Sequence, residues 1–261
     1  MSPAPAPLVF ITGASSGIGQ ALALHYHRAG WRLALVARRS DELGQWVQQQ
    51  GMAADRVAVY GADVRDVDAI TAAGRDCIDA MGLPDVVIAN AGISVGMDTA
   101  LAADLAVMRA TLETNNLGMA ATFQPFVGPM CQRRSGRLVG IASVAGIRGL
   151  PGHAAYSASK AAAIAYCESL RGECRPFGVR VVTLLPGYID TPLTQRNRYP
   201  MPFLMAPAAF ADRAFGAIAA GASYRVIPWQ MGWVARLLRL LPDPLFDRLF
   251  AGRPRKRRQH E

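Results

Sequence analysis

The sequence predicts an α/β domain with a doubly wound, mostly parallel sheet of about seven strands. Short apolar runs of β-forming residues alternate with longer segments of helical period along the 261 residues. The strand candidates are apolar on both faces, which is typical of a parallel sheet covered by helices on both sides. Because crossovers between parallel strands are right-handed, this alternation favours a Rossmann-like topology.

Apolar β-type runs mark the expected strands, which are Leu8–Thr12, Arg32–Ala37, Arg56–Tyr60, Asp85–Ala89, Arg137–Ala142, Arg180–Leu185 and Tyr224–Ile227. Helical periodicity between them is clear over Gln20–Ala29, Val67–Met81, Leu101–Glu113 and Ala154–Arg175. The proline-rich stretch from Pro186 to Pro207 is expected to be a loop or lid, because a helical segment and a last strand follow it. No linker divides the chain. We therefore expect one domain over residues 1–261, with a core over about 8–227 and a substrate lid over about 188–212.

Residues 228–261 extend the chain beyond the last expected strand. One apolar helical stripe consists of Trp233, Leu237, Leu240 and Leu241. Pro242 and Pro244 end this helix, and a second apolar set and a basic tail with Arg253, Arg257 and their neighbours follow. Two interpretations stay open. The apolar stripes pack on the protein's own body or on a partner subunit, or they contact an anionic membrane surface.

Composition and charge exclude several classes of protein. With 51% hydrophobic and 18% charged residues, the chain is not intrinsically disordered. The longest uncharged stretch, Thr114–Gln132, carries too many polar residues and prolines for a spanning helix. The first residues show no basic signal-peptide region, so we expect a cytoplasmic location, with peripheral contact at the inner membrane surface as the open alternative. The four cysteines form no metal-binding spacing. The net charge of +9 is divided between a mildly basic body and a basic tail, a pattern that does not predict nucleic-acid binding.

A glycine-rich turn joins the first expected strand to the first helix. The segment Thr12–Gly19 reads TGASSGIG and follows the strand at once. Glycines permit a tight turn and a close approach of backbone to phosphate, and the helix N-terminus adds unpaired N–H groups. The motif by itself is also compatible with an ordinary tight turn. Its place in the first βα unit favours a dinucleotide site.

The end of the second strand bears on the choice of cofactor. A carboxylate about 20 residues beyond the glycines would accept hydrogen bonds from ribose hydroxyls and repel a 2′-phosphate. The sequence has Ala37 there, followed by Arg38 and Arg39. Guanidinium groups bind phosphate, so NADP(H) is favoured over NAD(H).

Tyr156 and Lys160 are four residues apart and share one face of an expected helix. An unperturbed tyrosine has a pKa near 10, and a nearby ammonium lowers it by stabilising the phenolate. Such a spacing is common by chance. Ser143 at the end of a strand and Asn115 at the start of an uncharged helical segment make a catalytic group more convincing.

Taken together, these motifs resemble those of the short-chain dehydrogenase/reductase family over roughly residues 8–227. They occur in the family's order: TGASSGIG at 12–19, Asp63-Val64, Asn90-Ala91-Gly92, NNLG at 115–118, IASVAG at 141–146, YSASK at 156–160, and Pro186-Gly187 with Thr191 beyond. Ser16 departs from the family pattern, because many NADP-using members carry a basic residue inside the glycine motif. The preference for NADP therefore depends on Arg38 and Arg39.

The resemblance implies a role for each catalytic residue. Tyr156 would be the general acid in reduction and the base in oxidation, with its pKa lowered by Lys160, which would also hold the nicotinamide ribose. Ser143 would hydrogen-bond the substrate oxygen, and Asn115 would support a proton relay through water. The cofactor would contact Gly13, Ser15, Ser16, Gly17, Ile18, Gly19, Arg38, Arg39, Asp63, Val64, Asn90, Ala91, Gly92, Tyr156, Lys160, Pro186, Gly187, Ile189 and Thr191.

The substrate would be a hydrophobic ketone or secondary alcohol, because the lid segment Tyr199–Phe210 is apolar and no charge follows it before Asp212. The residues expected around it are Ile93, Val144, Ala145, Ile147, His153, Tyr188, Met201, Phe203, Leu204 and Met205. We expect His153 to have a rim or packing role, and no metal site. The alternatives are a reductase of 3-oxoacyl thioesters and a sensor that binds NADP without turnover. A homodimer or homotetramer is the expected assembly.

Overall fold

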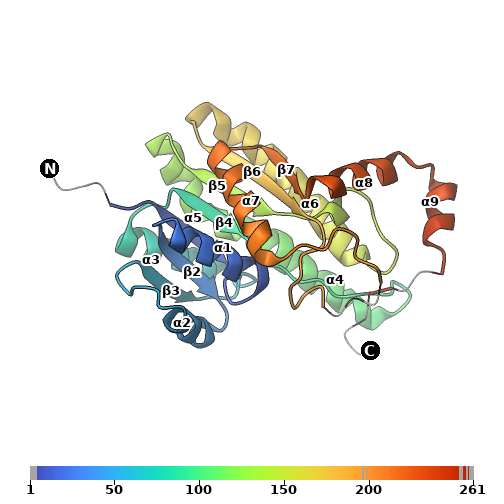
Figure 1. Ribbon diagram of the computed structural model, residues 1–261, viewed down its shortest axis with the longest axis horizontal. Coiled ribbons are helices and arrows are strands. Elements are labelled where there is room, and N and C mark those ends of the chain that lie inside the picture. Colours follow the sequence, from blue (N-terminus) through green and yellow to red (C-terminus); the bar gives the residue numbers. More distant parts are fainter. Residues whose placement is uncertain (1–4, 196, 198, 253–254, 257, 259–261) are drawn as a thin grey trace.

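The expected strands form one parallel sheet in the order β3-β2-β1-β4-β5-β6-β7 (Figure 1). The computed structural model describes residues 5–195, 197, 199–252, 255, 256 and 258. The strands are β1 (Leu8–Thr12), β2 (Arg32–Ala37), β3 (Val57–Gly61), β4 (Val86–Ala89), β5 (Arg137–Ile141), β6 (Arg180–Pro186) and β7 (Tyr224–Ile227). Because β4 returns to pair with β1 on the side away from β2, the sheet is doubly wound, which confirms the expected topology.

Both faces of this sheet are buried under helices. Leu8 and Phe10 of β1 pack on one face, and Val9 and Ile11 on the other, and all four are fully buried. The first face is covered by α3 (Val67–Met81), α5 (Gly118–Arg133) and α6 (Ala154–Cys174), and the second by α1 (Gly17–Arg28), α2 (Ser40–Gln49) and α7 (Pro207–Ala220). A further helix, α4 (Leu105–Leu112), packs on α6. Two buried faces explain why the strands read as continuous apolar runs.

The uncharged stretch that begins at Thr114 forms α5, which contains Pro125 and Pro129. A proline inside a helix removes a backbone hydrogen bond and kinks or breaks the helix unless its surroundings compensate. Here Gly74 of α3 leaves room for the Pro125 ring, which a Cβ at that position would strike. Among the described residues, no helix is both long enough and apolar enough to cross a membrane.

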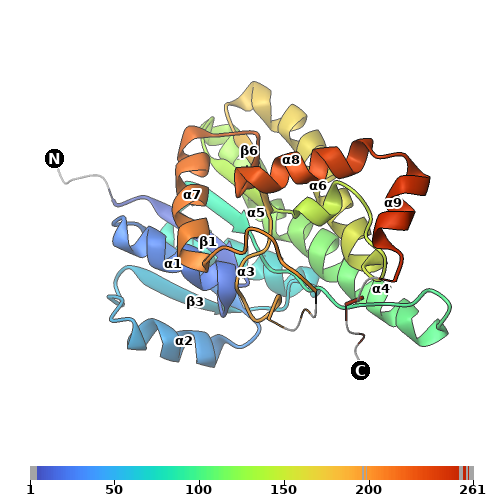
Figure 2. The same ribbon diagram turned by 45° about the vertical axis from the view of Figure 1, so that its right-hand side comes forward.

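The C-terminal extension forms two helices, α8 (Trp229–Leu240) and α9 (Asp243–Phe250), which lie beside the body of the protein (Figures 1 and 2). Met231 and Ala235 of α8 are buried, whereas Trp233, Leu237 and Leu240 are 64%, 66% and 80% exposed. The expectation that this stripe packs on the chain's own body is therefore wrong. Its packing on a partner subunit remains a prediction.

Steric fit explains which face of α8 turns inward. Gly232 lies so close to Val226 of β7 that an added Cβ would be 3.3 Å from its Cβ, and Met231 packs in the same way over Gly187. The face with Met231, Gly232 and Ala235 therefore lies against the body, and Trp233 is on the exposed face. The basic tail residues Arg253 and Arg257 lie outside the described residues.

Candidate active site

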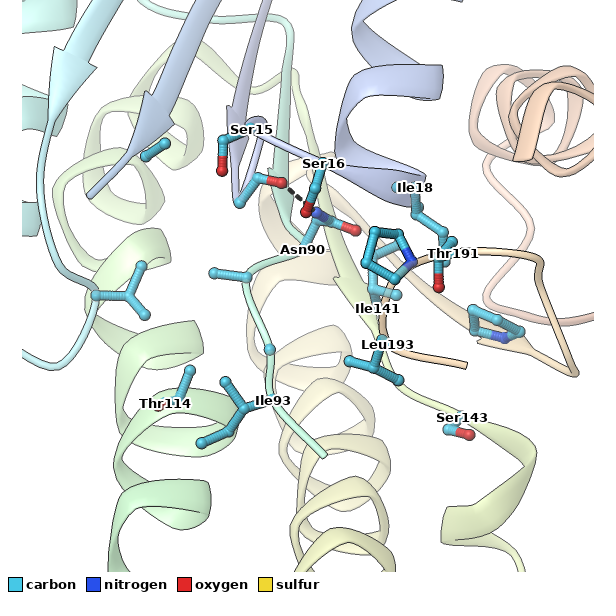
Figure 3. A pocket seen from close by; sticks show the side chains of 18 of the residues that line it. Ser15, Ser16, Ile18, Asn90, Ile93, Thr114, Ile141, Ser143, Thr191 and Leu193 are labelled. Carbon is cyan, nitrogen blue, oxygen red and sulfur yellow. Dashed lines mark hydrogen bonds between the residues drawn. The ribbon is translucent and has the colours of Figure 1, made fainter. Parts of the chain in front are cut away.

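A cavity of about 300 Å³ lies at the carboxyl ends of the strands. This is where a doubly wound sheet places its ligand site, because the strand order reverses there. Figure 3 shows Ser15, Ser16 and Asn90 at the glycine turn, with Ser143 at the other end of the cavity. The lining includes Gly13, Ser15, Ser16, Gly17, Ile18, Arg38, Arg39, Asp63, Val64, Asn90, Ala91, Gly92, Ile93, Ser143, Tyr156, Lys160, Pro186, Gly187, Ile189 and Thr191.

The glycine turn is shaped to receive an anion. Gly13 and Gly17 have φ angles of +66° and +54°, and a Cβ at Gly13 would lie 2.8 Å from the Cα of Ala91. At the start of α1, Ser16 makes no capping hydrogen bond with its side chain, and the first turn carries no acid. The N–H groups and the positive end of the helix dipole therefore remain available to a ligand. This geometry fits a pyrophosphate.

Thr12 and Asn90 fasten the turn to β4. The Asn90 side chain donates to the carbonyl oxygens of Thr12 and Gly13 over 3.0 and 3.2 Å, and its backbone N–H donates to the Thr12 hydroxyl over 3.1 Å. Asn90 therefore holds the turn in place as well as lining the cavity. Gly19 is absent from the cavity lining and permits close packing of the turn, because a Cβ there would strike the Gly13 carbonyl oxygen.

Charged side chains gather at the end of the cavity beside β2 and β3. Arg38 and Arg39 line it as expected, and Arg65 joins them. The Arg65 guanidinium binds Asp63 at 2.7 Å, and Arg38 lies 3.9 Å from the same carboxylate. Hydrogen bonds from Arg65 lower the pKa of Asp63, so this carboxyl is ionised at neutral pH. We did not expect Arg65 at the site, although its place just after β3 could have indicated it.

Ser143, Tyr156 and Lys160 meet at the opposite end. The Lys160 ammonium donates to the carbonyl oxygen of Ile141 over 2.8 Å and lies 5.7 Å from the centre of the Tyr156 ring. Burial raises the pKa of Tyr156, while a hydrogen bond with the Ser143 side chain opposes that rise, so the lowered pKa that the resemblance implies is not found in this structure. Burial lowers the pKa of Lys160 to about 8, so its ammonium is mainly protonated at pH 7.

Asn115 lies in a π-helical turn, Glu113–Leu117, just beyond this group. Its side chain accepts from the Ile93 N–H over 2.9 Å and donates to the Ile93 carbonyl and to the Ser159 hydroxyl over 3.0 and 2.9 Å. These bonds hold the loop that carries Ile93 against α6. Asn115 is not among the residues that line the cavity. Its part in a proton relay stays a prediction.

The residues expected around the substrate are spread more widely. Ile93 lines the cavity, and His153 is buried beside it, with its ring nitrogens 3.1 Å from the Pro151 carbonyl and 3.0 Å from the Tyr199 hydroxyl. Burial lowers the pKa of His153, so it is neutral at pH 7, which suits the expected packing role. The remaining candidates, which the cavity lining does not include, are Val144, Ala145, Ile147, Tyr188, Met201, Phe203, Leu204 and Met205.

The lid does not form the apolar pocket wall that its sequence predicts. Phe203 and Leu204 are 50% and 47% exposed, and Met205 forms a β-bridge with Ile189. Tyr199 packs between His153 and Tyr188, with ring centres 5.6 and 6.2 Å apart. The lid therefore places Tyr199 against His153 and Tyr188, and the cavity lining includes none of the three.

A family model described as short chain dehydrogenase matches residues 7–201. The chain belongs to the short-chain dehydrogenase/reductase family. An uncharacterized oxidoreductase of Myxococcus xanthus is 39% identical to it over 237 residues, which cover 91% of this chain and 93% of the relative.

Solved structures of other short-chain dehydrogenases share the fold of this protein. A short chain dehydrogenase from Burkholderia cenocepacia in complex with NADP has a TM-score of 0.81 and 26% identity, over 94% of this chain and 98% of that one. A short chain dehydrogenase/reductase from Burkholderia phymatum in complex with NAD has a TM-score of 0.80 and 24% identity, over 91% and 94%. The first of these two structures holds NADP and the second holds NAD.

Proposed function

We propose that the protein is an NADPH-dependent carbonyl reductase, or the reverse alcohol dehydrogenase, acting on a hydrophobic ketone or secondary alcohol. The observation that best supports this proposal is the arrangement of residues along a single cavity. Arginines and the glycine turn lie at one end, and Ser143, Tyr156 and Lys160 lie at the other. A dinucleotide held by the turn would extend along the cavity toward Tyr156.

The proposed chemistry depends on the protonation of Tyr156. The nicotinamide, when bound, supplies or accepts the hydride. Because burial raises its pKa, Tyr156 keeps its proton at neutral pH and can donate it to a carbonyl oxygen that Ser143 also binds. The phenolate left behind is stabilised by the Lys160 ammonium, since an opposite charge nearby favours the ionised form. Lys160 already donates to the Ile141 carbonyl, which fixes its position.

The preference for NADP(H) is supported by the chain's own residues. Arg38, Arg39 and Arg65 line the adenosine end of the cavity. The carboxylate found there, Asp63, is neutralised by Arg65 and Arg38. A 2′-phosphate would therefore meet a net positive charge, which favours its binding.

Replacing Tyr156 tests the proposed function. Tyr156→Phe should lower turnover of a ketone panel with NADPH by about 100-fold or more, because a positioned general acid contributes at least that much. NADPH affinity, measured by fluorescence, should stay nearly unchanged. The control is Tyr166→Phe, on the same helix but stacked on Phe123 outside the cavity. A tenth of the activity left in Tyr156→Phe would refute the role. No turnover of any ketone by the wild type would favour a sensor, and turnover of 3-oxoacyl thioesters alone would favour that reductase.

The outward face of α8 supports a homo-oligomer. Trp229, Trp233, Leu237 and Leu240 expose most of their surface, and apolar clusters of this kind mark contact surfaces. We propose that a second copy of the chain covers this face. The alternative is that this face of α8 contacts an anionic membrane, and an experiment must distinguish the two.

A further inference from the structure

The end of the chain is fastened next to the catalytic group. The Arg148 guanidinium donates to carbonyl oxygens at the end of α8, pairs with Asp243 at 2.8 Å and stacks 4.0 Å from the centre of the Phe246 ring. Farther along, Arg258 binds Asp104 at 2.9 Å, and the Asp104 side chain is only 4% exposed. These two anchors bracket α9 and the described tail residues. Lys256 and Arg258, two residues of the basic tail, are therefore partly buried.

Between the anchors, Lys256 points its ammonium toward the catalytic end of the cavity. Its Nζ donates to the Ser94 hydroxyl over 2.8 Å and to the Leu193 carbonyl over 3.4 Å. The same nitrogen lies 6.0 Å from the centre of the Tyr156 ring. Ser94 follows Ile93, and both Ile93 and Leu193 line the cavity. Lys256 therefore bridges the two loops beside the tyrosine that would protonate the substrate.

This ammonium has no acidic partner in the described part of the chain. Its two bonds go to neutral oxygens, whereas the neighbouring Arg258 has a carboxylate. Nearby His153 is neutral at pH 7, because burial and the Lys256 charge both lower its pKa. A partly buried charge without a counter-ion is costly, and an anion supplied by a ligand offsets that cost.

We propose that Lys256 binds a carboxylate of the substrate, so that the enzyme acts on oxo acids and hydroxy acids with an apolar chain. This inference depends on the proposed reductase function, because it identifies the substrate through the position of Tyr156. With the carbonyl oxygen at Tyr156, a carboxylate a few bonds away would reach the ammonium. A role as a structural tie between the two loops predicts instead that Lys256 affects charged and neutral ketones alike.

Matched pairs of substrates separate the two roles. The full-length enzyme would be assayed with NADPH on 4-oxopentanoate, 5-oxohexanoate and 6-oxoheptanoate, each beside its methyl ester. Wild type should have a higher kcat/KM on the acid than on the ester for at least one chain length. Lys256→Met should lower kcat/KM on that acid by roughly 10- to 100-fold, the effect of losing a hydrogen bond to a charged group, and should change the ester little. Lys256→Arg, which keeps the charge, should retain most of the preference.

The control is Arg258→Met, which weakens the tail anchor at Asp104 without removing the Lys256 charge. Because Lys256 keeps its charge and its bonds to Ser94 and Leu193, Arg258→Met should reduce the preference for the acid over the ester much less than Lys256→Met does. Equal losses on acid and ester in Lys256→Met, or no preference for the acid in wild type, would overturn the inference while leaving the reductase function intact.

Calorimetric titration of 5-oxohexanoate and its ester into the NADPH complex keeps the inference testable without turnover. The acid should bind more tightly than the ester to wild type, and Lys256→Met should remove that difference. If neither compound is reduced but this difference is found, the proposed function fails and carboxylate binding by Lys256 stands. If the difference is absent, the inference fails whatever the enzyme reduces.

Discussion

Removing the charge of Arg38 tests whether the adenosine end of the cavity selects a phosphorylated cofactor. Arg38 lies 3.9 Å from Asp63, and its side chain is 63% exposed. Arg38→Met keeps most of the length of the side chain but leaves no group to bind a 2′-phosphate. The substitution should therefore weaken NADPH and spare NADH, which has a hydroxyl at that position.

The exposure of Arg38 sets the size of the effect. Two unit charges about 4 Å apart interact by about 1 kcal/mol in water and about 4 kcal/mol at the effective dielectric of a protein surface. Because Arg38 is mostly solvated and already shares Asp63 with Arg65, the value should be near the lower limit. We expect about 1–2 kcal/mol, which is roughly 5- to 30-fold in kcat/KM.

The assay is kcat/KM for NADPH and for NADH at one saturating ketone concentration. Arg38→Met should show the 5- to 30-fold loss with NADPH alone. Arg171→Met is the control, because it removes the same charge from a surface pair with Glu168 outside the cavity. Equal losses with both cofactors, or no loss with either, would refute the assignment.

Arg65→Met tests whether neutralising Asp63 contributes to the preference for NADPH. Hydrogen bonds from the Arg65 guanidinium lower the pKa of Asp63. Without Arg65, the Asp63 carboxylate keeps only Arg38, at 3.9 Å, as a cationic partner among these residues. A 2′-phosphate would then meet an ionised carboxylate that is less well neutralised. NADPH should lose affinity more than NADH does. An equal loss for the two cofactors would mean that Arg65 only supports the loop.

Three further outcomes follow from the geometry. Burial lowers the pKa of Lys160 to about 8, and only the ammonium form attracts an anionic cofactor, so the Kd of the wild type for NADPH should rise above about pH 8. In Lys160→Met, fluorescence titration should find weaker NADPH binding and no such rise with pH. A rise that persists in this variant would mean that another group titrates. Gly19→Ala should lower the free energy of unfolding in urea by about 1–3 kcal/mol, because the new Cβ strikes the Gly13 carbonyl. The control Gly44→Ala, in open space within α2, should raise the free energy of unfolding by about 0.5–1 kcal/mol. Equal effects of the two substitutions would contradict the steric explanation. Trp233→Glu should dissociate the oligomer in sedimentation experiments, while a monomeric wild type that binds anionic vesicles would favour the membrane instead.

Hydrophobic pattern was enough to predict the sheet, because both faces of every central strand are buried. β1, β2 and β7 begin and end at the expected residues, and so does α3. Helix ends that depend on tertiary contacts were less predictable. The expected helix Leu101–Glu113 is reduced to α4, and a π-helical turn follows it where Asn115 binds the Ile93 backbone.

The candidate site was predictable where its residues follow strand ends. Parallel strands bring their carboxyl ends together, so Arg38, Asp63, Asn90 and Ser143 meet at one edge although they are far apart in the sequence. Contacts made by the lid and the tail depend on how distant segments fold back. No local pattern indicated that Lys256 would lie beside Tyr156.

The orientation of α8 shows why such contacts escape a sequence pattern. Periodicity identifies one apolar stripe on this helix, with Trp233 and Leu237, and predicts that it is buried against the body, a partner subunit or a membrane. In the structure the face with Met231 and Ala235 is buried instead, with Gly232 close to Val226 of β7 and Met231 over Gly187. This choice of face directs the chain toward Arg148, which holds the end of α8 and the start of α9. The position of Lys256 near Tyr156 thus depends on how α8, α9 and the tail fold back on the body, and these contacts link residues far apart in the sequence.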